Sequence, residues 1–254
     1  GMAAGSLMGA PFGEFLIRLE EEARRRRYTV CFYSGREEDY VHFLLERNMD
    51  AAVLVGFSEW DLPGVLQRRD IRCVLYDSFG QDTVHNHVRT DEVKGGYLAA
   101  ERLIDIGKRR LLFAGTTPIE NSFNIPSARY RGSLKACEAA GATLSVLEVG
   151  TSYEAGVAAA ARVVESGADG VVCMADIIAA GLVEGLTRLG KSIPDEIAVM
   201  GYDNLPLCLY ARPHLSTIDQ GLALKVKAVM DLVEMPAQAQ VRVVDPVLVV
   251  RESA

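Results

Sequence analysis

The sequence contains no apolar run long enough to cross a membrane. A spanning helix needs about 20 consecutive apolar residues, and charged or polar residues interrupt every apolar stretch of the 254 residues before that length. Residues 1–15 also show neither a basic flank nor a long apolar core, so no secretion signal is visible. We therefore expect a cytoplasmic protein with no membrane partner.

Cysteine and basic charge are both scarce. The five cysteines are Cys31, Cys73, Cys137, Cys173 and Cys208. They lie far apart with no C-x-x-C pair, which is typical of reduced and mostly buried thiols. Lys and Arg number 27 against 34 Asp and Glu, a net charge of −7. Nucleic-acid backbones are bound by clustered Lys and Arg, and the one basic run, Arg24 to Arg27, follows three acids in a pattern that indicates a solvated helix end.

Catalytic and cofactor motifs are also missing. No G-x-G-x-x-G follows a predicted strand, and no G-x-S-x-G is present. The triplet HNH at 85–87 has no acidic partners at a metal-site spacing, and neither His42 nor His214 has an evident Ser or Cys partner. We therefore expect no enzyme, no catalytic residue, no metal site and no cofactor.

Residues 185–192, GLTRLGKS, match the phosphate-loop pattern G-x4-G-K-S letter for letter. That pattern binds phosphate only where a strand precedes it and a helix follows. Here apolar residues at helical spacing run from Ile177 to Leu189, and Gly190 stands at a helix C-cap position ahead of a strand. The order is reversed, so we expect a helix end and no nucleotide binding.

Short apolar runs alternate with helical patterns along the whole chain. Strands are predicted at 28–33, 51–55, 72–77, 110–115, 144–149, 170–174, 196–203 and 247–250. Helices are predicted at 11–27, 37–47, 61–68, 92–106, 126–140, 154–166, 177–189 and 221–234. Apolar strands that alternate with helices are typical of parallel sheets covered on both faces. Because a single sheet would approach the usual size limit, the expected fold class is α/β with two doubly wound parallel-sheet subdomains.

Ligands of such sheets bind beyond the carboxyl ends of the strands. The loops expected there carry these polar residues: Asp91, Arg129, Arg131, Asp176, Asp203, Asn204, Asp219 and Gln220. Carboxylates and a guanidinium in one site can bond several hydroxyls of a small polar ligand. The alternative is that Asp176 caps a helix and Asp203 caps a turn, although a cap and a ligand contact are compatible.

Five segments, in this order, carry a family resemblance. They are TDEVKGGYLAAERLIDIGKRRLLFAG (90–115), SARYRGSLKACEAAG (127–141), IPDEIAVMGYDN (193–204), RPHLSTIDQ (212–220) and VLVVRES (247–253). In combination they resemble the lactose-repressor (LacI) family of bacterial transcription regulators, over nearly the whole chain. The part that is similar is the family's effector-binding core, which has the fold of type I periplasmic binding proteins.

This resemblance implies two subdomains joined by three chain crossings, which we expect near Gly107, near 217–220 and near Met235. The N-terminal subdomain would comprise residues 1–107 and 219–236, and the C-terminal subdomain residues 108–218 and 237–254. A first strand would lie within AAGSLMG, residues 3–9, with a contact loop from Met8 to Phe12 after it.

The resemblance also implies an effector between the subdomains. The ligand-binding residues that we expect are Phe12, Asp91, Phe123, Arg131, Asp176, Asp203 and Gln220. Trp60 and Tyr153 are weaker candidates for stacking on a sugar ring. Where the family usually has an Asn-Asp pair this chain has Ala175 and Asp176, so one hydrogen bond to a sugar is missing.

The implied function is effector binding and dimerisation in a LacI-family regulator, where cleft closure on a small polar effector such as a sugar controls operator binding. No segment before Pro11 supplies a recognition helix for DNA, so we expect a homodimer that contacts its operator only through a helix-turn-helix domain outside this chain. The alternative is a free-standing periplasmic sugar- or solute-binding protein of a transporter, which predicts a monomer and a signal peptide.

Overall fold

The computed structural model describes residues 10–33, 37–56, 62–78, 85–119, 124–235 and 239–254. The chain divides into two compact units, and each is built from two segments. Unit 1 comprises Gly1–Thr90 and Gly221–Val244, and unit 2 comprises Asp91–Gln220 and Asp245–Ala254. The chain therefore passes from one unit to the other three times.

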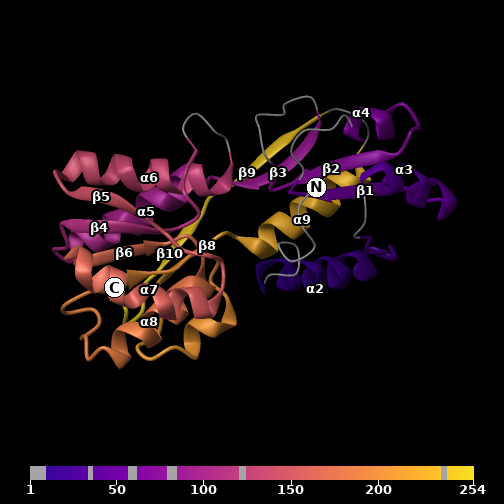
Figure 1. Ribbon diagram of the computed structural model, residues 1–254. Helices are drawn as coiled ribbons and strands as arrows, with labels where there is room; N and C mark the ends of the chain where they lie inside the picture. The colour runs from indigo at the N-terminus through magenta and orange to yellow at the C-terminus, as the bar shows by residue number, and fades with distance from the viewer. Residues whose placement is uncertain (1–9, 34–36, 57–61, 79–84, 120–123, 236–238) are drawn as a thin grey trace. The chain divides into compact units, whose positions relative to one another are not determined.

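Unit 1 contains a parallel sheet with helices on both faces (Figure 1). Its elements are α2 (Ala10–Arg25), α3 (Glu37–Glu46), β1 (Ala51–Val55), α4 (Leu62–Gln67), β2 (Arg72–Tyr76), β3 (Asn86–Thr90), α9 (Leu222–Glu234) and β9 (Val241–Val244). Within the described residues the strand order is β1-β2-β3-β9, which leaves β1 at one edge.

Side-chain alternation along the strands divides the core of unit 1 in two. Val53 and Tyr76 pack with α2 and α9 on one face, whereas Ala52 and Leu54 pack with α3 and α4 on the other. Successive residues of a strand point to opposite faces, so each face receives every second side chain. The basic run ends α2 as expected, and Arg26 ties this end to α9 through Asp231, at 2.8 Å.

Unit 2 also contains a parallel sheet, in the order β5-β4-β6-β7 within the described residues. Its elements are α5 (Glu92–Asp105), β4 (Arg110–Gly115), α6 (Ile125–Ala140), β5 (Thr143–Glu148), α7 (Tyr153–Ser166), β6 (Gly170–Cys173), α8 (Asp176–Arg188), β7 (Ala198–Met200), the 3-10 helix η1 (Pro206–Leu209), β8 (Thr217–Asp219) and β10 (Val247–Val249). Helices α5 and α6 cover one face and α7 and α8 the other (Figure 1). All four residues of β6 are buried, as expected for a central parallel strand.

The unit boundaries differ from those expected. The first crossing lies at Thr90–Asp91 rather than near Gly107, and the third at Val244–Asp245 rather than near Met235. Helix α5 belongs to unit 2 because it packs closely against α6. A side chain at Gly96 would collide with the backbone oxygen of Arg129 at 1.9 Å, so this glycine permits the close approach of the two helices.

Two strand predictions are wrong in their extent. Residues 28–33 lie outside any strand, since within the described residues nothing pairs with 29–32. The strand expected at 196–203 is limited to β7, after which the chain bonds to the segment that contains β8: Gly201 N donates to Ser216 O at 2.8 Å, and Asp203 N to Ile218 O at 2.9 Å. The first strand expected within residues 3–9 lies outside the described residues.

The phosphate-loop match is a helix end, as predicted. Helix α8 runs to Arg188 and is capped by Leu189, and Gly190 has a φ of 72°, which suits a residue that follows a helix. All five cysteines are free thiols, and three of them are buried. Among the described residues no helix is long and apolar enough to cross a membrane.

Candidate functional site

The candidate site lies at the carboxyl edge of the sheet in unit 2. Because β4, β6 and β7 are parallel, the residues that follow them meet at one edge, where α/β sheets bind ligands. Met174 follows β6, Tyr202 and Asp203 follow β7, and Arg129 reaches the same place from the first turns of α6.

Arg129 is the centre of this cluster. Its Nε donates to Glu92 Oε2 at 2.6 Å, and its Nη1 donates to the backbone oxygen of Met174 at 2.5 Å. Its Nη2 lies 3.7 Å from Asp203 Oδ1, and its guanidinium lies 3.5 Å from the centroid of the Tyr202 ring. Burial disfavours the charge, but the adjacent carboxylates outweigh burial and hold the pKa of Arg129 above its usual value.

Asp203 occupies a constrained position beside Arg129. Its φ is 114°, in the region that non-glycine residues rarely adopt. Gln220 Nε2 donates to its Oδ1, and the side chain is only 5% exposed. Burial raises the pKa of Asp203 to about 8, although the charge of Arg129 acts in the opposite direction. Gln220 and Asp203 are thus brought together, and their role as effector contacts stays a prediction.

Asp176 has a structural role in addition to any role in binding. It is fully buried, and its two oxygens accept from Leu205 N at 2.8 Å and from Thr217 Oγ1 at 2.6 Å. Burial raises the pKa of Asp176 to about 6. It does not cap α8, because the N-cap is Ala175, which makes no side-chain cap bond. The capping alternative for Asp176 is therefore wrong: this carboxylate holds the loop after β7 against β8.

Asp91 and Arg131 belong to the two helices that carry Glu92 and Arg129. Asp91 caps α5, and its side chain accepts from Lys94 N at 2.9 Å. Arg131 is half-buried on α6, and its role as an effector contact stays a prediction. Arg129 was named among the polar residues of these loops but not among the expected ligand contacts. The sequence carries a signal for it, since Arg129, Gly132 and Ser133 have the spacing of one helix face, and this face is buried.

The aromatic candidates for the site belong to other elements than the polar cluster of unit 2. Phe12 is half-buried in α2 of unit 1, where its ring centroid lies 6.1 Å from that of Phe15 and 5.7 Å from that of Phe32. Tyr153 is the first residue of α7 and is 38% exposed. Phe123 and Trp60 lie outside the described residues.

The sheet of unit 1 has its own polar pair at its carboxyl edge. Asp77 follows β2 with a φ of 44°, and Lys225 in the first turn of α9 donates to its Oδ2 at 2.7 Å. Lys225 is 1% exposed and lies 4.8 Å from the centroid of the Tyr76 ring. This pair was not among the site residues expected from the sequence, although Lys225 shares a helix face with Val226 and Val229, which are buried.

The cluster of unit 2 contains more buried carboxyl groups than buried guanidinium groups. Three buried carboxyl groups, those of Glu92, Asp176 and Asp203, lie near one buried guanidinium. A ligand with several hydroxyl groups suits this arrangement, since a hydroxyl can both donate to and accept from carboxyl groups. Within the part of the chain that the structure describes, no group of His, Cys, Asp and Glu has the arrangement of a metal site.

Sequence comparisons place the chain among transcription regulators and binding proteins. Residues 100–254 match the family of periplasmic binding protein-like domains. The repressor PurR of Yersinia enterocolitica is 30% identical over 234 residues, which cover 87% of this chain and 67% of that protein. The PurR of Photobacterium profundum is 28% identical, over 82% of this chain and 65% of that protein. The chain thus spans about two thirds of the length of these relatives.

Solved structures give the same result. A LacI-family transcriptional regulator from Enterococcus faecium, crystallised with bound ribose, has a TM-score of 0.82 and 25% identity, over 96% of this chain and 94% of that one. The regulator CelR in its cellobiose complex has a TM-score of 0.83 at 21% identity, over 99% of this chain and 82% of that one. The second likeness shows the fold alone.

Proposed function

Because this chain belongs to the LacI family and has the fold of that family's effector-binding core, we propose that it is the effector-binding domain of a bacterial transcription regulator. The observation that carries the proposal is the cluster of Arg129, Asp203 and Gln220 at the carboxyl edge of the sheet in unit 2. Binding there changes the operator affinity of the full-length regulator, which works in the cytoplasm and contacts DNA through a part outside this chain.

The effector that we propose is a small neutral polyol, such as a pentose or a hexose. Buried carboxyl groups and an amide favour a ligand that presents several hydroxyl groups. An anionic effector is disfavoured, because the guanidinium of Arg129 is already paired with Glu92 at 2.6 Å. The Enterococcus faecium regulator with bound ribose supports the same ligand class.

Within the site we assign direct contacts to Asp203 and Gln220 and a supporting contact to Arg129. Asp91 and Arg131 remain proposed contacts, and Phe12 is the proposed apolar contact from unit 1. Asp176 acts mainly by fixing the loop after β7, which carries Asp203, since both oxygens of Asp176 already accept hydrogen bonds.

The test is a calorimetric titration of the purified chain with a panel of neutral pentoses and hexoses. For a sugar that binds, Asp203→Asn should weaken the affinity about 10- to 150-fold at about pH 9, where Asp203 with its pKa of about 8 is mostly ionised, because a hydrogen bond to a charged group contributes about 1.5–3 kcal/mol. The matched control is Glu184→Gln, which changes an exposed acid on α8 of the same unit, paired only with its neighbour Arg188 in the described structure.

Two outcomes would contradict the proposal. One is that no neutral sugar of the panel binds while an anionic compound does, and the other is that Asp203→Asn and Glu184→Gln have the same affinity. We also propose a homodimer, which light scattering should detect as twice the chain mass of 27.6 kDa. A monomer at micromolar concentration would favour the transporter-type binding protein instead.

A further inference from the structure

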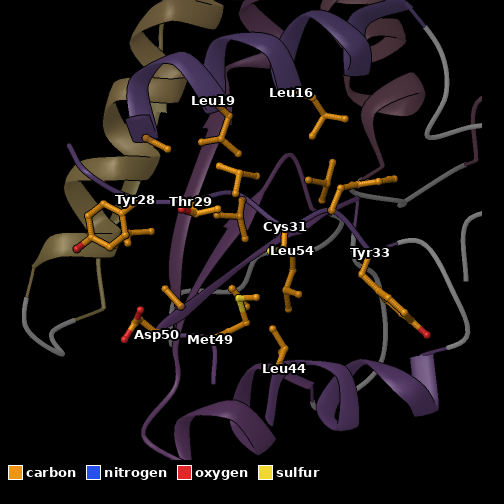
Figure 2. A pocket seen from close by; sticks show the side chains of 18 of the residues that line it. Leu16, Leu19, Tyr28, Thr29, Cys31, Tyr33, Leu44, Met49, Asp50 and Leu54 are labelled. Atoms are coloured by element: carbon orange, nitrogen blue, oxygen red, sulfur yellow. The ribbon is translucent and has the colours of Figure 1, made fainter. Parts of the chain in front are cut away.

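Unit 1 contains a cavity of about 230 Å³ that α2 and α3 border from opposite sides (Figure 2). In Figure 2, Leu16 and Leu19 project into it from α2, and Leu44 projects from α3. Among the described residues that line the cavity, Asp50 alone is charged. This lining suits apolar groups, whereas the charged groups that can distinguish one polar ligand from another lie in the cluster of unit 2.

Glu92, the first residue of α5, forms a two-point ion pair with Arg129 in that cluster. Arg129 Nε donates to Glu92 Oε2 at 2.6 Å, and Nη2 donates to Oε1 at 3.3 Å. Asp203 Oδ1 lies further away, 3.7 Å from Nη2, and it accepts a hydrogen bond from Gln220. The guanidinium therefore takes its counterion from α5 rather than from the loop that carries Asp203.

The described contacts of Arg129 account for three of the five N–H groups of a guanidinium. Two N–H groups donate to Glu92 and one donates to the backbone oxygen of Met174. The Tyr202 ring covers one face of the guanidinium, 3.5 Å from its carbon. One N–H group on Nη1 and one on Nη2 remain, so a ligand that accepts from them meets an arginine whose charge is already compensated.

The position of Glu92 is fixed by close contact between α5 and α6. A side chain at Gly96 would lie 1.9 Å from the backbone oxygen of Arg129, and one at Gly132 would lie 1.9 Å from that of Val93. The two backbones thus touch next to both members of the ion pair. Because close-packed helices have little room to shift, a ligand cannot easily displace the carboxylate of Glu92 from the guanidinium.

We propose that Glu92 is a specificity-determining residue: by neutralising Arg129, it makes the site accept a neutral polyol and reject the corresponding sugar acid. This inference rests on the proposed function, which places the effector at this cluster. The physical reason is repulsion between like charges across the guanidinium. Two carboxylates about 7 Å apart, at an effective dielectric constant of about 20, repel each other enough to change an affinity about 50-fold.

Glu92→Gln tests this inference, because the amide keeps the size of the side chain and can still accept from the guanidinium, but carries no charge. Calorimetric titrations at pH 6 compare ribose with ribonate, galactose with galacturonate and glucose with glucuronate. The Glu92→Gln chain should bind at least one acid at least about 10-fold more tightly than the unaltered chain does. The matched control is Glu184→Gln, the same change at an exposed position on α8, which should leave the affinity for the acids unchanged.

Asp203 provides a second background for this test. Burial raises the pKa of Asp203 to about 8, and the charge of Glu92 adds to the rise. Glu92→Gln therefore makes Asp203 easier to ionise, and an ionised Asp203 would replace Glu92 as the counterion of Arg129. The titrations are repeated with Asp203→Asn and with Glu92→Gln/Asp203→Asn, where the gain in affinity for an acid should again be at least about 10-fold.

If Glu92→Gln does not fold, Glu92→Asp replaces it, and withdrawal of the carboxylate by one methylene should raise the affinity for an acid about 2-fold. The inference is overturned if neither background gains affinity for an acid, if Glu92→Asp as the replacement gains none, or if Glu184→Gln gains as much. It is also overturned if the unaltered chain binds an acid more tightly than the neutral sugar. The proposed function fails by a different result, the absence of binding of any neutral sugar to the unaltered chain, whereas the gain is measured on the acids alone.

Discussion

Replacing Arg129 with Met tests the electrostatic structure of the site. The substitution removes the partner of Glu92 at 2.6 Å and the neighbour of Asp203 at 3.7 Å, and both acids are buried with it. Removing one member of a buried ion pair costs about 3–5 kcal/mol, because the remaining charge is buried without compensation. We therefore expect the unfolding free energy of unit 2 to fall by about 3–5 kcal/mol near pH 8.

The loss should depend on pH, with a sign that follows from Asp203. Its pKa in the folded protein is raised from an ordinary 3.8 to about 8, so ionisation of this carboxyl destabilises the fold as the pH rises from about 4 to about 8. Arg129 opposes this rise in the pKa, so its removal raises the pKa of Asp203 further. Asp203 is protonated in both proteins near pH 5.5, so its part of the deficit appears only as the pH approaches 8, where it amounts to about 0.4 kcal/mol.

Urea unfolding followed by circular dichroism measures this effect at both pH values. The matched control is Arg131→Met, the same change two residues further along α6, at a half-buried position. The double variant Arg129→Met/Glu92→Gln should recover at least half of the loss, since one uncompensated charge is removed. A deficit below about 1 kcal/mol near pH 8, a clearly larger deficit near pH 5.5 than near pH 8, or an equal effect of Arg131→Met would refute the reasoning.

Four further outcomes are expected. Asp176→Ala should lower the unfolding free energy by about 2–4 kcal/mol in a urea titration, because two buried donors lose their acceptor. Asp77→Asn should cost about 3 kcal/mol, since it removes the carboxylate that lies 2.7 Å from the buried ammonium of Lys225, and adding Lys225→Met should restore most of the urea midpoint. Asp203→Asn should flatten the pH dependence of thermal unfolding between about pH 4 and pH 8. Lys191→Ala should leave titrations with a fluorescent nucleoside triphosphate unchanged, because that residue follows a helix end and neither chain should bind.

Most helices and the inner strands were predictable because their periodicity is strong. The expected helix at 126–140 is observed as Ile125–Ala140, and the expected strand at 110–115 is observed as Arg110–Gly115. Both elements are covered by other elements of unit 2, so their apolar pattern repeats without interruption. The false phosphate loop was recognised for a similar reason, since the apolar spacing of α8 continues through it.

The predictions that failed depend on contacts between segments that are distant in the sequence. A strand at 28–33 needs a neighbour, and strand propensity in residues such as Val30 says nothing about whether that neighbour is present. The first crossing was placed near Gly107, because no local pattern shows that α5 packs against α6 rather than against unit 1. Arg131 was matched to a motif by its spacing, and its role stays a prediction, whereas helix-face periodicity accounts for the burial of Arg129.

The loop after β7, which carries Asp203, is held in place by contacts within unit 2. Asp203 and Asn204 have φ values of 114° and 53°, and such backbone persists only where the surroundings hold it. Asn204 accepts from Arg251 Nη2 at 2.8 Å and donates to Asp219 Oδ2 at 2.9 Å, while Asp176 holds the next residue. Because this loop is already ordered, binding costs little free energy for ordering it. The affinity then depends directly on the polar groups that the loop presents. Under the proposed function the choice among polyols rests on the proposed contacts of Asp203 and Gln220, because Ala175 makes no side-chain hydrogen bond.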